Sequence, residues 1–204
     1  MCIKQNRVSS FVFRLMLSVT FFVCLPAHAN DEAWTESYRL EQVFQYDAAI
    51  NALKAISSNS ELVLLRRGWL NYQKGSHSSA INHYQKAIAK NPDSLDARLG
   101  VMLPLLSQQR WREAAKHANK VLAVAPWNIH AHLRLMKCEQ QLKQWKELEK
   151  HASAVYKRYP SDASVLVFLA RAQLKQGNSA AARKTYAKVL ELYPDNFEAK
   201  QYVN

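Results

Sequence analysis

The sequence predicts an all-α fold built by stacking helical hairpins, and three observations support this prediction. Alanine, leucine, lysine, glutamine and glutamate, which favour helices, dominate the composition. Only 4 of the 204 residues are glycine, too few for the many tight turns of an all-β fold, and no stretch alternates apolar and polar residues over the length of a strand. Four of the 6 prolines recur every 34 residues, at Pro92, Pro126, Pro160 and Pro194.

Other positions follow the same 34-residue spacing. Small or apolar residues stand twelve, eight and five residues before each proline: Ala80, Ala114, Leu148 and Ala182; Tyr84, Ala118, Ala152 and Tyr186; Ala87, Val121, Val155 and Val189. These positions share one face of a helix, and a small residue at the first of them lets a second helix approach closely. The proline ends that helix because it has no N–H group and disfavours helical backbone at the residue before it.

Each 34-residue unit therefore has room for two helices and two short connections. Gly75 and Gly177 stand at the same place in two units, where they allow the turn between the paired helices. Pro104 falls inside one expected helix and should bend it. We expect helices at 33–44, 46–57, 61–74, 77–90, 95–108, 111–124, 129–142, 145–158, 163–176 and 179–192, followed by a short capping helix.

The segment 61–94 resembles a tetratricopeptide repeat, because it carries that family's signature residues Leu64, Gly68, Gly75, Ala80, Tyr84, Ala87 and Pro92 in order. The resemblance implies a right-handed superhelical α-solenoid that fills residues 30–204 as one array. Its units would be 61–94, 95–128, 129–162 and 163–196, preceded by a divergent unit at about 31–60 and followed by a short C-terminal cap at 197–204.

Residues 1–29 have the pattern of a secretory signal peptide. Lys4, Arg7 and Arg14 are basic, the run from Leu15 to Leu25 is largely apolar, and Ala27-His28-Ala29 matches a cleavage site. A run of 11 residues is too short to span a bilayer comfortably. We expect cleavage after Ala29 and a periplasmic protein with no transmembrane span; the alternative is an uncleaved signal that retains the chain at the inner membrane.

Cleavage would leave Cys138 as the one cysteine of the mature chain. A single thiol in an exported protein is either buried or reactive. Cys138 lies in an apolar stretch with Leu135, Met136 and Leu142, and free cysteines usually pack as small apolar residues. We therefore expect it to be buried.

In the family that the chain resembles, the first helix of each unit lines a concave groove that holds a partner peptide or helix. By that geometry, the groove residues are Trp34, Tyr38, Leu65, Trp69, Tyr72, Leu99, Leu103, Leu133, Lys137, Gln141, Arg171 and Lys175. The set is aromatic and aliphatic at its N-terminal end and basic at its C-terminal end. It favours a protein or peptide partner with apolar and acidic features. The alternative is that the aromatic residues only pack between adjacent helices.

One subclass of the family grips a C-terminal carboxylate with an asparagine in a fixed position. The corresponding residues here are Trp69, Leu103, Lys137 and Arg171, so we do not expect that mechanism.

The chain has a formal net charge of +12, but the charge is unevenly placed. Residues 30–60 hold two basic and five acidic side chains, whereas the segments 61–94, 95–128, 129–162 and 163–204 each carry three more basic than acidic side chains. Nucleic acid is not expected as a partner of an exported protein. An acidic protein or an anionic glycan is compatible with the basic segments, and so is the alternative that these charges only keep the array soluble.

The sequence shows no catalytic constellation. It has no HExxH, GxSxG, GxGxxG or Walker-type motif, and no two histidines stand four residues apart. We expect no enzyme activity, no metal and no cofactor. The favoured function is a non-catalytic protein–protein interaction scaffold in the cell envelope, and the alternative is a module that binds an anionic envelope polysaccharide.

Overall fold

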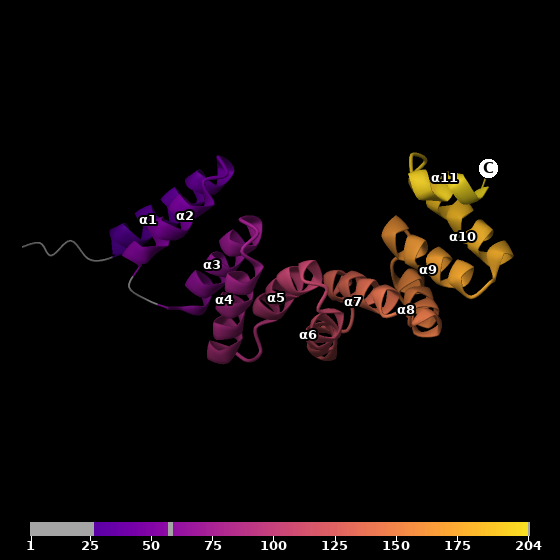
Figure 1. Cartoon of the computed structure of the whole chain (residues 1–204), viewed down its shortest axis with the longest axis horizontal. Coiled ribbons are helices and arrows are strands. Elements are labelled where there is room, and N and C mark those ends of the chain that lie inside the picture. The colour runs from indigo at the N-terminus through magenta and orange to yellow at the C-terminus, as the bar shows by residue number, and fades with distance from the viewer. Residues whose placement is uncertain (1–26, 57–58, 204) are drawn as a thin grey trace, which may run out of the picture.

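The computed structural model describes residues 27–56 and 59–203, which form a solenoid of paired helices (Figure 1). The predicted fold class is confirmed, and the described residues contain no β-strand. The helices are α1 (Ala27–Gln42), α2 (Tyr46–Ala52), α3 (Glu61–Gln73), α4 (His77–Lys90), α5 (Leu95–Ser107), α6 (Trp111–Val124), α7 (Ile129–Gln141), α8 (Trp145–Arg158), α9 (Ala163–Lys175), α10 (Ser179–Leu192) and α11 (Phe197–Val203), with a short 3₁₀ turn at Leu53–Ala55.

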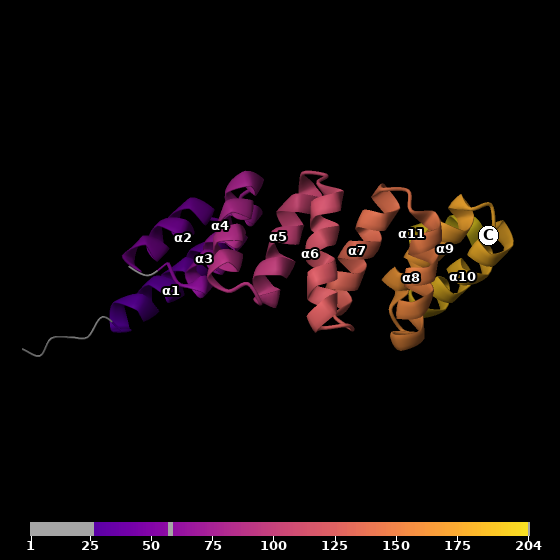
Figure 2. The same ribbon diagram turned by 90° about the horizontal axis from the view of Figure 1, so that it is seen from below.

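Each helix from α1 to α10 packs against the helix that follows it, and the odd-numbered helices from α3 to α9 also pack against one another in order. Figure 1 shows the resulting curve, with α5 and α7 on its inner side and α6 on its outer side. Figure 2, turned by 90°, shows the central helices side by side along the long axis. The odd-numbered helices therefore line the inner face of the array.

The starts of the odd-numbered helices are set by capping residues spaced 34 residues apart. The side chains of Ser94, Asn128 and Asp162 each accept a hydrogen bond from the backbone N–H three residues on. Ser60 and Asn196 do the same for α3 and α11. Such caps satisfy N–H groups that the helix itself leaves unpaired. The ends of the even-numbered helices α4, α6, α8 and α10 fall two residues before the repeated prolines.

The turn within each hairpin contains one residue in the left-handed backbone region. Gly75 and Gly177 adopt φ of 84° and 83°, as the sequence predicts for these glycines. The other three turns use Phe44, Gln109 and Lys143, at φ of 59°, 57° and 57°. A side chain in this region costs energy that glycine avoids.

The first unit differs from its prediction. The second helix was expected at 46–57, but α2 ends at Ala52 and the 3₁₀ turn follows. The backbone carbonyl of Leu53 accepts a hydrogen bond from the Arg67 Nη2 atom at 3.0 Å, so a side chain of α3 takes the place of further helix. The first helix also begins earlier than expected, at Ala27, within the predicted cleavage motif.

The remaining predictions about the chain divide in two. Cys138 is fully buried, as expected, and burial raises the pKa of its thiol to about 12. Residues 1–26 of the predicted signal peptide lie outside the described residues, so that prediction stays open. Helix α5 runs through Pro104, and the expected bend also stays a prediction. No described helix is long and apolar enough to cross a membrane.

Candidate binding cavity

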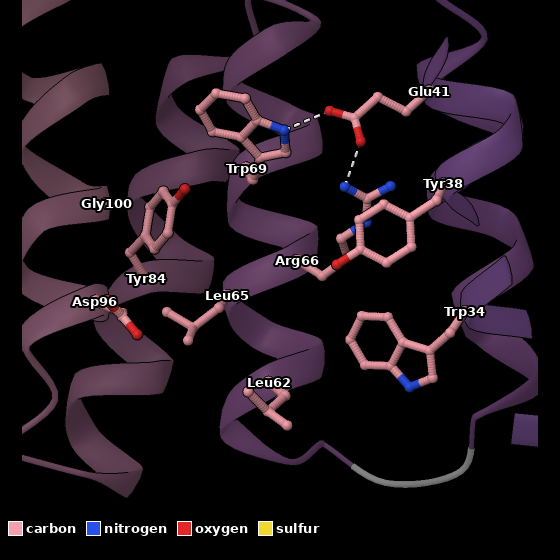
Figure 3. A pocket seen from close by; sticks show the side chains of 10 residues that line it. All are labelled: Trp34, Tyr38, Glu41, Leu62, Leu65, Arg66, Trp69, Tyr84, Asp96 and Gly100. Carbon is pink, nitrogen blue, oxygen red and sulfur yellow. Dashed lines mark hydrogen bonds and ion pairs between the residues drawn. The ribbon is translucent and has the colours of Figure 1, made fainter. Parts of the chain in front are cut away.

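The N-terminal end of the inner face contains a cavity of about 670 Å³ between α1, α3 and α5 (Figure 3). Ten residues line it: Trp34, Tyr38, Glu41, Leu62, Leu65, Arg66, Trp69, Tyr84, Asp96 and Gly100. Four of them, Trp34, Tyr38, Leu65 and Trp69, belong to the groove set that the sequence predicts.

One wall of the cavity is aromatic and is held by a buried arginine. Trp34 and Tyr38 stack on each other along α1, with ring centroids 6.3 Å apart. The Arg66 guanidinium lies over the Tyr38 ring, 3.8 Å from its centroid. Arg66 also donates to the Ser37 hydroxyl at 3.2 Å and to the Ser37 carbonyl at 3.0 Å. These contacts fix the Tyr38 ring against α3 while leaving 52% of this residue exposed.

Glu41 joins this wall to α3 through both of its carboxylate oxygens. One oxygen accepts a hydrogen bond from Arg66, and the other accepts one from the Trp69 indole N–H at 2.5 Å (Figure 3). Arg66 is 6% exposed and Glu41 is 21% exposed, so their charges balance in a largely dry setting. Neither group offers a free charge to a ligand.

The opposite wall is formed by Tyr84, which reaches the cavity from the outer helix α4. Its ring fits between Gly68 and Gly100, where an added Cβ would lie 2.9 Å and 2.3 Å from ring atoms. Glycine at both places is what lets a ring from the outer layer pass between two inner helices. Tyr84 is 3% exposed, and burial raises the pKa of its hydroxyl above its usual value.

Asp96 supplies the unpaired charge of this cavity. It is exposed in the first turn of α5, and its side chain extends toward Leu65 (Figure 3). Among the described residues, none makes a hydrogen bond or ion pair with its carboxylate. The cavity thus combines aromatic faces, the two leucines Leu62 and Leu65, and one free negative charge.

A second, smaller cavity of about 430 Å³ lies at the C-terminal end, between α9 and α11. Arg171 projects there and is held by Glu198 of α11, with Nε to Oε1 at 2.8 Å and Nη2 to Oε2 at 2.5 Å. It also donates to Gln140 at 3.0 Å. The Tyr186 hydroxyl donates to Glu198 at 2.6 Å. Burial opposes ionisation of Glu198, but the hydrogen bonds from Arg171 and Tyr186 outweigh it and lower the pKa of this carboxyl.

The other groove residues that the sequence predicts lie outside the first cavity. Tyr72 is half-buried and tilts against Trp69, with ring centroids 5.9 Å apart. Half-buried Leu99 and Leu133 pack against separate core clusters. Leu103 and Lys137 are half-buried, Gln141 and Lys175 are exposed, and Arg171 is engaged by Glu198.

Sequence reasoning missed the roles of Arg66, Tyr84, Gly100 and Glu198. A signal existed for one of them, Tyr84. Tyr84 and Tyr186 are the two tyrosines among the residues that precede the repeated prolines by eight, and both reach the inner face of the array. The contacts of Arg66 and Glu198 join different units, and a search within single units does not reveal them.

A hydrogen-bonded cluster of two histidines and a glutamate in the fourth unit was also not predicted from the sequence. His132 Nδ1 lies 2.8 Å from His151 Nε2, His151 Nδ1 lies 2.9 Å from Glu139 Oε2, and His132 Nε2 lies 2.9 Å from the Pro126 carbonyl. These contacts form one continuous line of hydrogen bonds, from Glu139 of α7 through His151 of α8 and His132 of α7 to the carbonyl of Pro126. Within the described ranges, no three histidine, cysteine or acidic side chains are placed to hold a metal ion.

Comparison with known families agrees with this architecture. Two tetratricopeptide repeat profiles match residues 41–101 and 149–202, which together span more than half of the chain. The chain belongs to the tetratricopeptide repeat family. A search of curated proteins finds no match.

Solved structures of tetratricopeptide repeat proteins share the fold at low sequence identity. Residues 41 to the end of MamA from Desulfovibrio magneticus RS-1 are 17% identical, with a TM-score of 0.75, over 83% of this chain and 97% of that one. YrrB, described as a TPR protein with an unusual peptide-binding site, is 16% identical, with a TM-score of 0.70, over 85% and 93% of the two chains. TTC0263, a thermophilic TPR protein of Thermus thermophilus, is 18% identical, with a TM-score of 0.62, over 85% and 96%.

Proposed function

We propose that this tetratricopeptide repeat protein is a non-catalytic scaffold that holds a segment of a partner protein along its inner face. The observation that carries the proposal is the aromatic cavity between α1, α3 and α5, which opens on that face. Clustered aromatic side chains in a partly enclosed site are typical anchors of protein interfaces.

The exposure of the cavity residues supports this proposal. Leu62 and Tyr38 are 66% and 52% exposed although both are large and apolar. Such residues gathered at one cavity are more typical of a contact surface than of a solvated face. The fold neighbour YrrB is described as having a peptide-binding site, which is a precedent for peptide binding on this architecture.

The basic end of the inner face adds a feature to the partner that we propose. Arg171 is neutralised by Glu198, so Lys137 and Lys175 would be the groups that meet an acidic portion of the partner segment. A partner with a bulky portion at α1–α3 and acidic residues toward α7–α9 would match this distribution.

We further propose that the protein acts in the periplasm as part of cell-envelope machinery. The signal-peptide pattern of residues 1–29 supports this location. Cell fractionation followed by mass spectrometry of the N-terminus tests it. A periplasmic protein beginning at Asn30 is the expected result. An intact N-terminus in the cytoplasmic fraction would refute the proposed location but would not bear on the scaffold function.

Site-specific photocrosslinking in cells tests the scaffold function. A photoreactive residue at Leu62, at the cavity, should capture a defined partner protein. The same residue at Lys86, exposed on the outer helix α4, is the matched control. Replacing Trp34 and Trp69 by alanine should reduce the Leu62 crosslink strongly. Equal crosslinking from both positions, or crosslinking only to polysaccharide, would contradict the proposal.

A further inference from the structure

The two cavities of the inner face occupy the same place in the repeat. When positions are counted from the first residue of each unit, Trp69 and Arg171 both stand at position 9, and Tyr84 and Tyr186 both stand at position 24. Asp96 and Glu198 both stand at position 2 of the following unit. The linings of the two cavities share positions 2, 5, 6 and 9 of one unit and position 2 of the next, and Tyr186 lies beside the C-terminal cavity through its hydrogen bond to Glu198.

A fourth position completes the correspondence. The left-handed residues Phe44, Gly75 and Lys143 mark the same turn in their units, so Glu41 and Gln140 both lie three residues before that turn. In the C-terminal cavity, the position-9 residue Arg171 donates to Gln140. In the N-terminal cavity, the position-9 residue Trp69 donates to Glu41 in the same way.

The two cavities differ in what their position-2 acid binds. Glu198 receives two hydrogen bonds from the Arg171 guanidinium and one from the Tyr186 hydroxyl. Asp96 has no such partner among the described residues, because the indole of Trp69 has a single N–H and that group is given to Glu41. The molecule thus shows, at its C-terminal end, that the position-2 acid and the position-24 tyrosine accommodate a guanidinium.

We propose that the N-terminal cavity binds an arginine side chain of the partner segment, with its guanidinium at Asp96 and its stem against Leu62 and Leu65. This inference rests on the proposed scaffold function and names the chemistry of the partner at one site. The aromatic rings suit this occupant, since Arg66 already stacks on Tyr38 at 3.8 Å in the same wall.

Charge distribution agrees with a cationic occupant. Among the residues that line the cavity, Glu41 and Asp96 are acidic and Arg66 is basic, which leaves one net negative charge. The arginine within the cavity wall, Arg66, does not favour an anion there because it is 6% exposed and already paired with Glu41. An arginine at Asp96 would meet a net negative setting.

Peptide titrations of the purified full-length protein test the inference. The probe is acetyl-Leu-Arg-Leu-amide, compared with the same peptide carrying citrulline, which has nearly the shape of arginine without its charge, or glutamate. Binding is followed by calorimetry at fixed ionic strength. We expect arginine to bind about tenfold more tightly than citrulline. Equal affinity for the two peptides would overturn the inference.

A pair of variants assigns the preference to the cavity. Asp96→Asn should remove the tenfold preference for arginine over citrulline, whereas Asp93→Asn, at an exposed residue just before α5, should keep it. Thermal unfolding of both variants checks that they remain folded. Preserved preference in Asp96→Asn would refute the assignment.

The crosslinking experiment separates this inference from the function on which it rests. A partner segment captured at Leu62 should contain an arginine at the site of the crosslink. Capture of a segment that has no basic residue would refute the arginine inference and support the scaffold. Absence of any crosslink from Leu62 would refute the scaffold, whatever the peptide titrations give.

Discussion

The two ends of the inner face use the same repeat positions for opposite purposes. At the C-terminal end, the chain's own Arg171, Tyr186 and Glu198 satisfy one another and fasten α11 to α9 and α10. At the N-terminal end, Trp69, Tyr84 and Asp96 stand at the same positions and surround a larger cavity, of about 670 Å³ against 430 Å³. One geometry thus serves cohesion at one end and, in our proposal, recognition at the other.

The residue that faces the position-24 tyrosine also differs between the two ends. The Tyr186 ring stacks on Tyr202 of α11, with centroids 4.8 Å apart and planes within 8°. The corresponding position opposite Tyr84 is Gly100, which leaves room for the Tyr84 ring at the edge of the cavity. Substitutions at matched positions can therefore test whether the C-terminal residues affect mainly stability and the N-terminal residues mainly binding.

The largest effect should come from removing the acid that closes the C-terminal end. Glu198→Ala leaves Arg171 and the Tyr186 hydroxyl without their shared partner. Because the two charged side chains are 35% and 28% exposed, solvent screening limits the loss of unfolding free energy to about 1–2 kcal/mol. Urea denaturation measures it. The matched Asp96→Ala should change stability by less than about 0.5 kcal/mol. Equal losses of stability in the two variants would contradict the proposed difference between the two ends.

The next effect should come from making the N-terminal end resemble the C-terminal one. Trp69→Arg places a guanidinium at position 9, where it can donate to both Glu41 and Asp96. The built-in arginine should compete with the peptide and lower the affinity for acetyl-Leu-Arg-Leu-amide about tenfold, as measured by calorimetry. Trp69→Phe removes the indole N–H without adding charge and should retain the preference for arginine over citrulline. An unchanged affinity in Trp69→Arg would contradict the equivalence of the two cavities.

A smaller loss of stability should appear as the pH falls, and it should arise in the middle of the array and not in its last unit. Position 23 is His83, His117 and His151 in three successive units but Thr185 in the last. Burial lowers the pKa of His83 and His117, and nearby Arg67, Lys86, Arg98 and Lys120 add to the effect. The Nδ1 atoms of both rings are buried with no hydrogen-bond partner in the described chain. Burial also lowers the pKa of His132, which packs on His151.

Because these folded-state pKa values lie below the unfolded value of about 6.5, the unfolded chain binds protons first as the pH falls. Stability should be complete above a pH of about 6.5 and decline below it, until the pH is lower than the folded-state values. Urea denaturation at a series of pH values on both sides of that point measures the decline. The double variant His83→Gln and His117→Gln should flatten it, and an unchanged slope would show that these rings are not its source.

The smallest effect concerns the hairpin turns. Lys143 holds a left-handed conformation at φ of 57°, where Gly177 sits at the matched turn of the next unit. Lys143→Gly should stabilise the fold by about 0.5–1 kcal/mol, and Gly177→Ala should destabilise it by a similar amount. Thermal unfolding measures both changes. A loss of stability in Lys143→Gly would mean that the lysine makes contacts that offset its backbone strain.

Residues that recur with the 34-residue repeat predict most of the helix boundaries. The eight helices from Glu61 to Leu192 lie within one residue of their predicted bounds, because prolines, caps and turn residues recur with the repeat. The first unit was less predictable, since the Arg67 side chain, which lies outside that unit, meets the carbonyl of Leu53 where α2 was expected to continue.

The candidate site was predictable only in part, for the same reason. Trp34, Tyr38, Leu65 and Trp69 follow from the groove positions that the family resemblance implies, and they lie together at one cavity. The pairing of Arg66 with Glu41 and of Arg171 with Glu198 depends on how neighbouring helices are placed. The sequence therefore suggested a free basic end at Arg171, and the structure shows that this arginine is already engaged.

The histidine line of the fourth unit has a consequence of its own. The Pro126 carbonyl can only accept, so His132 must carry a proton on Nε2, and each of the next two contacts needs one proton between its atoms. Two of these three hydrogen bonds join α7 to α8, so polar side chains as well as apolar packing hold this hairpin together.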